Sequence, residues 1–380
     1  MISSEIIARE FPQQEGIIHL NHAGVSPWPA RTGQAIADFA SENVVHGPVD
    51  YPRWMEKEIL LRKQLRALLN APSTDDIALV KNTSEGLSMV AAGLDWRAGD
   101  NIVSSDQEFP SNRIVWEALE ARGVTLRQAG LAGPGSPEDA LFALVDRHTR
   151  MIAISSVQYA TGLRMDLARI GAFCRDHGLL FCIDAIQSLG ALPLDVQAVH
   201  ADFVVADGHK WLLAPEGLAV FYVRAAARER LRPTQFGWHM VEHAGDYDRE
   251  TWEVAASARR YECGSPNMLG IHGLSASLSL LLECGMDEVS RCVLDNSAWL
   301  AAGLSALPGI TLVSDTAAGR RSGIVAFRHD TVPATRLHRH LLQHNIVCAL
   351  RAGAVRFSPH FYTSRARMER ALACVSEALA

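Results

Sequence analysis

The chain has 380 residues, of which 48% are hydrophobic and 21% are charged, a composition typical of folded globular proteins. Its formal net charge of -6 gives no electrostatic reason to expect binding to nucleic acid or to an anionic membrane. No apolar run reaches the ~18 residues that a membrane-spanning helix needs. The length allows one large domain and a smaller one.

The cysteines and the amino-terminal residues indicate a cellular compartment. The seven cysteines are scattered, with neither a C-x-x-C pair nor a zinc-like spacing. This pattern is typical of reduced thiols in a cytoplasmic protein, and no metal site is expected. The segment from Met1 to Glu10 lacks the basic-then-apolar pattern of a signal peptide. We therefore expect a cytoplasmic protein.

Apolar runs of strand length alternate with helical stretches from about residue 75 to residue 225. The expected strands are Ile77–Val80, Asn101–Ser104, Val124–Arg127, Met151–Ser155, Leu179–Ile183, Asp202–Ala206 and Leu218–Val223. The expected helices between them are Ser84–Leu94, Ser111–Arg122, Pro137–Arg147 and Leu167–His177. Alternation of this kind predicts an α/β fold, with a mostly parallel sheet of seven strands covered by helices on both faces.

The remaining residues predict a second, smaller α+β domain. Two helices are expected at Met268–Glu283 and Met286–Ala306, and the second of them would lead into this domain. The later strands and helices are expected at Ser322–Phe327, Ile346–Leu350, Ala354–Ser358, Pro333–His344 and Ser364–Ala378. We expect a large domain over residues 15–285 and a small domain over residues 286–380, joined in space by an amino-terminal arm of residues 1–14.

Two segments place an acid and a lysine at the ends of strands. One apolar run ends on Asp184 in D-A-I-Q-S-L-G, and a second leads to Lys210 in A-D-F-V-V-A-D-G-H-K-W-L. Ligands of an open α/β sheet bind at the carboxyl ends of its strands, so both groups should face one crevice. A lysine amine forms a Schiff base with the aldehyde of pyridoxal 5'-phosphate, and an acid keeps the pyridine nitrogen protonated. The alternative is a partly buried Asp–Lys ion pair.

Further residues would complete a cofactor site. Thr83 and Ser84 follow a strand and open a helix, where free amides and the helix dipole favour a phosphate, although they are also common capping residues. Phe109 lies in a loop that should face the same crevice, where its ring can stack on a cofactor or simply pack. Gln187 offers a neutral amide donor, and His209 lies beside Lys210.

Two arginines near the carboxyl terminus are candidates for binding a substrate carboxylate. Arg351 and Arg356 lie in L-R-A-G-A-V-R-F-S, at an expected pair of strands. A guanidinium holds a carboxylate through two parallel hydrogen bonds. The alternative is a surface salt bridge, and the face on which Arg356 lies is not settled by the pattern.

These segments resemble a known family. D-A-I-Q-S-L-G followed by D-G-H-K-W-L is similar to the class V aminotransferase group of fold-type I pyridoxal-phosphate enzymes. The closer likeness is to its branch of cysteine desulfurases, selenocysteine lyases and isopenicillin-N-epimerase-like proteins. The resemblance implies that Lys210 carries the cofactor and moves protons, while Asp184 pairs with the pyridine nitrogen. Gln187 would face the phenolic oxygen, and Phe109 would replace the stacking histidine of the family.

The same resemblance implies a homodimer with shared active sites. Thr83, Ser84 and His209 would hold the phosphate, and Ser265 in G-S-P-N would contact the phosphate of the neighbouring subunit. Arg356 matches the arginine that binds the carboxylate of an amino-acid substrate. Trp238, and Asn21 with His22, are expected on the substrate side, although Trp238 is equally consistent with packing between domains.

Some residues depart from the family pattern. Asp207 stands where desulfurases place a phosphate-binding serine, and a carboxylate there should point away from the phosphate. Tyr159 stands near the position of an asparagine, for which Gln158 is a candidate substitute. Desulfurases also carry a nucleophilic cysteine on a loop between the two arginine positions, where this chain has only A-G-A-V.

The lack of a cysteine between the two arginines disfavours desulfuration, because that reaction needs a thiolate to take the sulfur. Cys348 and Cys263 do not match the position of the family's nucleophile. We therefore expect removal of the Cα proton by Lys210, followed by β-elimination, epimerisation or transamination, which the sequence separates poorly. The alternatives are a desulfurase or selenocysteine lyase with an unrecognised thiol, and a non-catalytic regulatory protein that binds the cofactor. A nucleotide-binding enzyme is disfavoured because no G-x-G-x-x-G or Walker-type loop follows the first strands.

Overall fold

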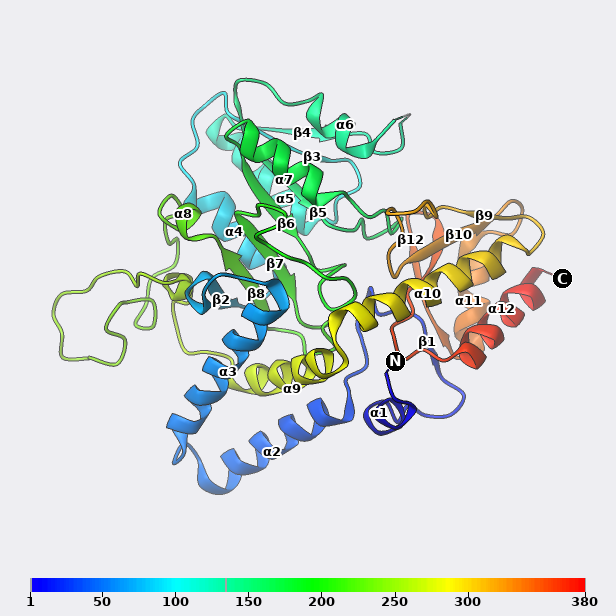
Figure 1. Ribbon diagram of the computed structural model, residues 1–380, viewed down its shortest axis with the longest axis horizontal. Coiled ribbons are helices and arrows are strands. Elements are labelled where there is room, and N and C mark those ends of the chain that lie inside the picture. Colours follow the sequence, from blue (N-terminus) through cyan, green and yellow to red (C-terminus); the bar gives the residue numbers. More distant parts are fainter. Residues whose placement is uncertain (1, 134, 380) are drawn as a thin grey trace.

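A seven-stranded sheet forms the centre of the larger part of the molecule (Figure 1), in a computed structural model that describes residues 2–133 and 135–379. The strand order is β2-β8-β7-β6-β5-β3-β4, and β8 alone runs against the other strands. The strands are β2 (Ile77–Val80), β3 (Asn101–Ser105), β4 (Thr125–Ala129), β5 (Thr149–Ser155), β6 (Leu180–Asp184), β7 (Phe203–Asp207) and β8 (Ala219–Val223). The predicted α/β fold with a mostly parallel sheet is confirmed.

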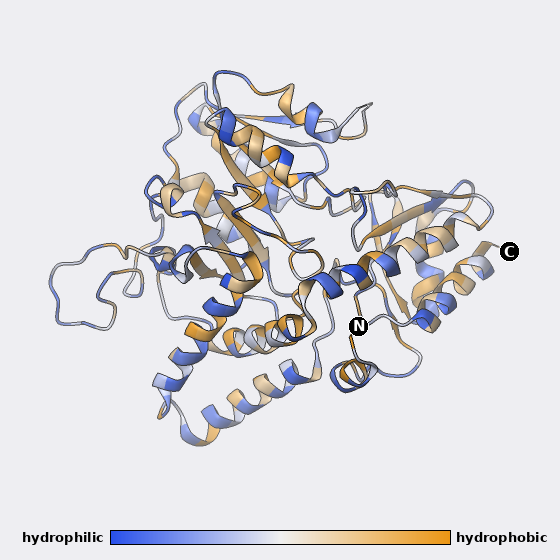
Figure 2. Cartoon of the chain, viewed as in Figure 1, coloured by the Kyte–Doolittle hydropathy of each residue, from blue (hydrophilic) through white to orange (hydrophobic). Residues whose placement is uncertain are grey.

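Helices cover both faces of this sheet because its strands are apolar on both sides. Successive side chains of a strand point to opposite faces, so Phe181 and Ile183 of β6 join one apolar cluster while Leu180 and Cys182 join another. Hydrophobic residues accordingly concentrate on the central strands, while the outer helices carry more hydrophilic residues (Figure 2). The covering helices include α4 (Thr83–Gly93), α5 (Ser111–Glu117), α6 (Pro137–Phe142), α7 (Leu167–Asp176) and α8 (Ala225–Arg228).

Two long helices near the amino terminus were not among the expected elements. α2 (Ala30–His46) and α3 (Tyr51–Leu69) both pack against α9 (Met268–Cys284), below the sheet in Figure 1. The buried residues Leu61, Leu65 and Leu68 of α3 recur at helical spacing, which is the signal that predicts such a helix.

The second domain contains a four-stranded sheet with order β12-β13-β10-β9. Its strands are β9 (Ile310–Leu312), β10 (Val325–His329), β12 (Ala349–Arg351) and β13 (Ala354–Phe357), and β9 was not expected. The helices of this domain are α10 (Met286–Ser305), α11 (Ala334–Gln343) and α12 (Arg365–Leu379). They enclose an apolar cluster that includes Phe327, Leu337 and Val375.

The amino-terminal segment packs with this second domain. After α1 (Ser4–Glu10), β1 (Ile18–His19) pairs in parallel with β11 (Ile346–Val347), and Leu20 joins the apolar cluster of the second domain. β1 therefore packs away from the large domain to which the expected boundary at residue 15 assigned it. The division of the chain at residues 285 and 286 stays a prediction.

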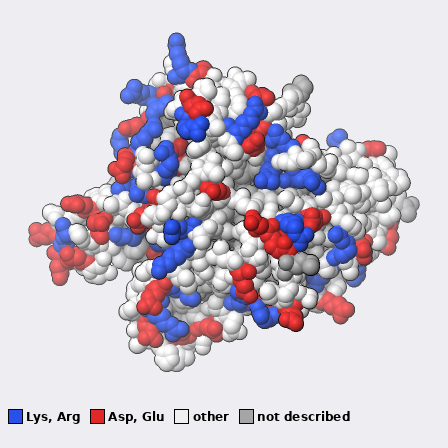
Figure 3. Space-filling view, in the orientation of Figure 1, with Lys and Arg blue, Asp and Glu red and all other residues white. Residues whose placement is uncertain are grey.

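Two surface features complete the description. Within the described residues, no single helix is long and apolar enough to cross a membrane, although α9 and α10, bent by 85° at their junction, would pass that test as a pair. Acidic and basic side chains are interspersed on the face in Figure 3. Acidic groups gather at its left on the loop of residues 236–253, here called the protruding loop.

Candidate active site

A cavity of about 370 Å³ lies where the carboxyl ends of β6 and β7 meet the start of α4 and the β12–β13 hairpin. It brings together nine of the predicted site residues, namely Thr83, Ser84, Phe109, Asp184, Gln187, His209, Lys210, Arg351 and Arg356. We call this cavity the lysine pocket. Residues that the sequence reasoning did not select also line it, and these are Ala23, Gly24, Val25, Asn82, Ser111 and Ile186. Three of them, Ala23, Asn82 and Ile186, directly adjoin predicted site residues, so their position beside those residues was the available signal.

Asp184 and Lys210 are both buried in this pocket, with exposed fractions of 1% and 9%. Burial raises the pKa of the Asp184 carboxyl, while the backbone N–H of Ile186 donates to its Oδ1 at 3.0 Å. Burial likewise lowers the pKa of the Lys210 ammonium, and the nearby Asp184 charge opposes that shift. A lysine with a lowered pKa is more readily available as a free amine, the form that acts as nucleophile or base.

The amino terminus of α4 offers unused hydrogen-bond donors to the lysine pocket. The Thr83 hydroxyl is buried and has no hydrogen-bond partner in the described structure. The Ser84 hydroxyl donates to the Ser111 hydroxyl at 2.8 Å, and the Asn82 side chain caps the helix by accepting from the Glu85 N–H. Because a helix amino terminus also presents free backbone amides, this corner suits a phosphate group.

Phe109 faces the lysine across the pocket. The Lys210 Nζ lies 5.5 Å from the centroid of the Phe109 ring, and Tyr159 packs against that ring edge-on with centroids 5.2 Å apart. The ring is 40% exposed, so its free face is open to the cavity. This placement fits an aromatic ring stacked above a flat ligand that the lysine holds.

Gln187 and His209 are held by polar neighbours. The Gln187 carbonyl accepts from the Trp211 Nε1–H at 3.1 Å, and its amide donates to the Ala23 carbonyl at 3.1 Å. The amide nitrogen carries a second hydrogen, so it retains one donor. The His209 Nδ1 lies 2.9 Å from Asp207 Oδ1, an ion pair when the histidine is protonated.

Arg356 is a buried cation whose hydrogen-bond partners are all neutral. It is only 1% exposed, donates to the Tyr159 carbonyl at 2.6 Å and to the Asn21 side chain at 3.2 Å, and has an unpaired Nε. No described carboxylate forms a salt bridge with it, and burial lowers its pKa. A buried guanidinium without a counter-charge is costly, so a carboxylate ligand would be strongly favoured here. Arg351 is exposed on the same hairpin.

Four predicted site residues lie outside the lysine pocket. His22 is fully buried behind it, between the Ser358 carbonyl and the Tyr362 hydroxyl, because its ring nitrogens bond both groups. Asn21 reaches the pocket only through its hydrogen bond to Arg356. Ser265 lines a neighbouring cavity, and Trp238 lines a cavity formed by the protruding loop. Direct contact of these four with a ligand of the same subunit is therefore not supported.

The departures from the family pattern also have defined places. Asp207 lines the lysine pocket and lies beside His209, and its orientation away from a phosphate stays a prediction. Gln158 is fully buried and donates to the Glu108 carboxylate at 2.8 Å, so it is not the expected substitute, whereas Tyr159 lines the pocket.

No cysteine lines the lysine pocket among the described residues. The nearest in sequence to the arginines is Cys348, which is buried and whose thiol pKa burial raises to about 12. Arg351 pairs with Ala354 across the β12–β13 ladder, so only Ala352 and Gly353 form the turn. A two-residue turn leaves no loop that can carry a nucleophilic thiol to the lysine.

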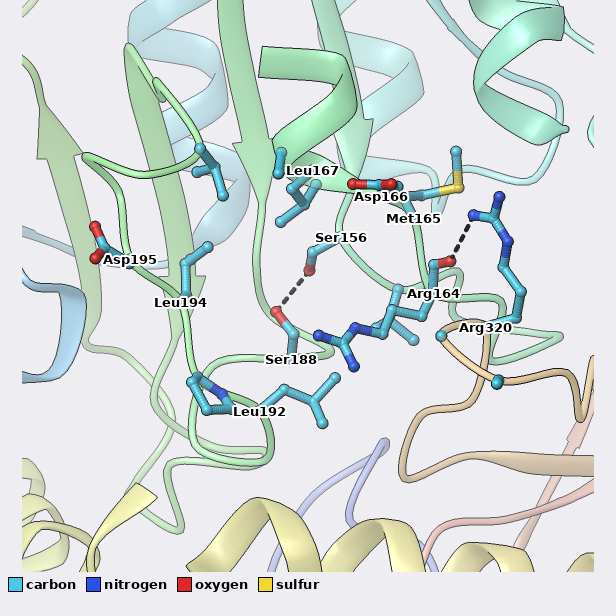
Figure 4. A pocket seen from close by; sticks show the side chains of 16 residues that line it. Ser156, Arg164, Met165, Asp166, Leu167, Ser188, Leu192, Leu194, Asp195 and Arg320 are labelled. Carbon is cyan, nitrogen blue, oxygen red and sulfur yellow. Dashed lines mark hydrogen bonds between the residues drawn. The ribbon is translucent and has the colours of Figure 1, made fainter. Parts of the chain in front are cut away.

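A separate cavity of about 440 Å³ lies between the loops that follow β5 and β6 and residues 318–320 (Figure 4). The Ser156 and Ser188 hydroxyls lie 2.6 Å apart there, and the Arg320 side chain donates to the Arg164 carbonyl. None of the predicted site residues lines it, so the chemistry is assigned to the lysine pocket.

A lysine and an acid at strand ends, beside a helix amino terminus and a buried arginine, define an α/β enzyme that anchors an anionic cofactor through an amine. The chain belongs to the aminotransferase class-V family, whose model matches residues 18–367. The predicted family and enzyme class are thereby confirmed.

Similar proteins agree with this assignment. The chain is 30% identical over 321 residues to a probable cysteine desulfurase of Methanothermobacter thermautotrophicus, covering 82% of this chain and 78% of that protein. The solved cystine C-S lyase C-DES, in complex with cysteine persulfide, has a TM-score of 0.91 at 26% identity and covers 97% of this chain and 99% of that one. A C-DES mutant with glycine covalently linked to its PLP cofactor has a TM-score of 0.90 at 25% identity, with coverages of 97% and 98%.

Proposed function

We propose that this protein is a pyridoxal-phosphate-dependent lyase that cleaves the C–S bond of a sulfur-substituted amino acid by β-elimination. The observation that carries this proposal is a lysine pocket that, among the described residues, contains an uncompensated arginine but no thiol. Such a pocket can bind an amino-acid carboxylate and move a proton, yet it cannot accept sulfur on a cysteine of the enzyme.

The residues of the pocket fit the cofactor. Lys210 would hold it covalently through the amine, Asp184 would face the pyridine nitrogen, and Phe109 would cover the ring. The orphan Thr83 hydroxyl and the neighbouring Ser84 would receive the phosphate at the start of α4. When bound, pyridoxal phosphate supplies an electron sink for the pair of electrons left at Cα after proton loss.

The protein side of the reaction follows from two residues. Arg356 holds the substrate carboxylate, which fixes the Cα–H bond relative to Lys210. Once the substrate amine has displaced it, the Lys210 amine would be free to take the Cα proton, and the sulfur would leave from Cβ as a thiolate that gains a proton. The net change is RS–CH2–CH(NH3+)–COO- plus water to RSH, pyruvate and ammonium, which needs no oxidant.

Cysteine desulfuration is the second candidate. The Methanothermobacter relative, a probable cysteine desulfurase, favours it, whereas C-DES is a cystine C-S lyase and favours elimination. Desulfuration would require a persulfide on an enzyme cysteine, whereas Cys348 is buried with a raised thiol pKa. Epimerisation and transamination begin with the same proton removal and need no thiol either.

The products separate these outcomes. The purified holoenzyme would be incubated with L-cystine and, separately, with L-cysteine, and the products would be identified by mass spectrometry. We expect pyruvate and ammonia in equal amounts with a sulfur product, and no activity in Lys210→Ala. Alanine would instead establish desulfuration, and a D-amino acid would establish epimerisation. A keto acid that retains the sulfur substituent, formed as an added keto acid accepts the amino group, would establish transamination.

The assembly and the compartment belong to the same proposal. Exposed aromatic side chains on the protruding loop, among them Phe236, Tyr247 and Trp252, support a homodimer in which this loop meets the second subunit. Ser265 would then serve the phosphate of the neighbouring subunit. All seven cysteines are free, which supports a reducing, cytoplasmic location.

A further inference from the structure

We propose that His340, His344 and Cys374 bind one divalent transition-metal cation of the zinc class. One ring nitrogen of each histidine and the Cys374 Sγ all lie within 4.8 Å of one another. His340 lies in α11, His344 caps the carboxyl end of that helix and Cys374 lies in α12, at the end of the second domain remote from the seven-stranded sheet (Figure 1). The proposed site is therefore independent of the lysine pocket and of the reaction proposed there.

The fold brings these ligands together from two helices. His340 and His344 are four residues apart at the end of α11, so both rings lie on one face with centroids 4.3 Å apart. α11 packs against α12, and Cys374 is buried at that contact within the apolar cluster of the second domain. No short sequence motif contains all three residues, because Cys374 comes from another helix.

Two hydrogen-bonding observations point to a missing ligand. The His340 Nε2 is buried and has no hydrogen-bond partner in the described structure, although a buried polar atom normally has one. The His344 Nδ1 lies 2.9 Å from the His340 carbonyl, which can only accept, so the proton is on Nδ1. In the neutral ring, the Nε2 atom of His344 then carries the lone pair that a metal would take. Metal-bound histidines usually donate their second ring N–H to such a carbonyl.

The ligand set selects the cation. Imidazole nitrogen and thiolate sulfur suit zinc and related transition metals, whereas magnesium and calcium take oxygen ligands. Ligand atoms around one tetrahedral zinc are roughly 3.3 to 3.6 Å apart, so the present spacing requires an inward movement of about 1 Å. His344 is exposed and can make that movement.

Metal binding would replace the thiol proton of Cys374. The metal forms a bond to sulfur as the S–H bond loses its proton to solvent, with no change of oxidation state. Burial and the Glu377 charge raise the pKa of this thiol, while Arg370 opposes the shift. The exposed Glu377, one helical turn beyond Cys374, or a water molecule would complete the fourth position. The bound cation would link α11 to α12.

Cobalt(II) and zinc(II) are suitable probes of the untagged full-length holoenzyme. Cobalt bound to a thiolate in a tetrahedral site gives charge-transfer and d–d absorption, recorded as a difference spectrum against the same holoenzyme. Zinc stoichiometry would be measured by equilibrium dialysis and elemental analysis, and thermal unfolding would be followed with and without zinc. We expect one equivalent per chain, a thiolate–cobalt band and a higher unfolding temperature with zinc.

Variants then assign the ligands. His344→Ala removes an exposed side chain and should leave the fold intact, yet zinc affinity should fall by about tenfold or more. Cys374→Ala should also remove the thiolate–cobalt band. The matched controls are His338→Ala on the same helix and Cys292→Ser on α10, which should bind zinc like the wild type. Absence of the thiolate band, or equal zinc affinity in His344→Ala and wild type, would overturn the proposal.

Discussion

Arg356 shows how burial gives a single residue its chemistry. The same arginine on a surface would form an ordinary ion pair of little energetic value. Here the guanidinium is removed from water and meets only neutral oxygens from Tyr159 and Asn21. Its charge is balanced only when an anion enters the pocket. The free-energy cost of the unbalanced charge in the empty pocket therefore favours binding of a carboxylate.

Replacement of Arg356 tests this role. In Arg356→Gln we expect kcat/KM for the amino acid to fall by roughly 30- to 1,000-fold, about 2–4 kcal/mol, because the substrate carboxylate loses a buried ionic partner. Unfolding stability should not fall in parallel, since an uncompensated buried charge is removed as well. Steady-state kinetics and urea unfolding measure the two effects. The matched control is Arg351→Gln, where the exposed arginine should contribute less; an equal loss in both variants would contradict the assignment.

At the scale of elements, the β12–β13 hairpin determines which chemistry the pocket can support. Its two-residue turn has φ values of +47° at Ala352 and +74° at Gly353. Positive φ at both positions is the geometry of the tight turns that match the twist of paired strands. Glycine adopts it freely, whereas alanine there is strained by its Cβ. The turn keeps Arg351 and Arg356 on paired strands of one hairpin, and both arginines line the lysine pocket.

The strain at Ala352 predicts the effect of a substitution. Ala352→Gly should raise the free energy of unfolding by about 0.5–1 kcal/mol, because relief of the left-handed conformation outweighs the added freedom of the unfolded chain. Ala302→Gly is the matched control, since Ala302 is exposed within α10. This substitution should lower the free energy of unfolding by about 1 kcal/mol. Urea denaturation of both variants measures the increase in the free energy of unfolding expected for Ala352→Gly and the decrease expected for Ala302→Gly. A loss of stability in Ala352→Gly would show that the turn is not strained.

At the scale of the whole molecule, one subunit alone leaves part of the expected site unused. The loop that carries Trp238 extends away from the body of the protein, and Ser265 lies outside the lysine pocket. Both facts are explained if a second subunit brings these residues to the neighbouring site. Aromatic residues on the loop, such as Phe236, would then be covered at the interface.

Mixed dimers test whether the sites are shared. Lys210→Ala and Ser265→Glu would each be expected to have little activity, the second because a carboxylate repels the phosphate. After the two variants are unfolded and refolded together, one site of each mixed dimer would contain both wild-type residues. Activity should recover to roughly a quarter of the wild-type value, because half of the dimers are mixed and each has one intact site. No recovery, with mixed dimers present by native mass spectrometry, would place Ser265 in its own subunit's site, whereas full activity of Ser265→Glu alone would place it in none.

Several features of this protein follow from its sequence alone. Buried strands such as β6 are continuous apolar runs, so their order along the chain and the α/β class are predictable. The acid and lysine follow such runs, and the carboxyl ends of strands converge, so Asp184 and Lys210 could be placed in one pocket in advance. The motif around Lys210 also predicts the family, which the match over residues 18–367 confirms.

Other features depend on contacts between segments far apart in the chain, which local periodicity does not encode. The burial of Arg356 depends on Asn21 and Tyr159, and the pairing of β1 with β11 joins residues more than three hundred positions apart. The metal site proposed at His340, His344 and Cys374 was not expected from cysteine spacing, because its ligands come from two helices. Sequence determined the elements and the chemistry at strand ends. Only tertiary packing decided which charged groups are buried away from water and which distant residues are in contact.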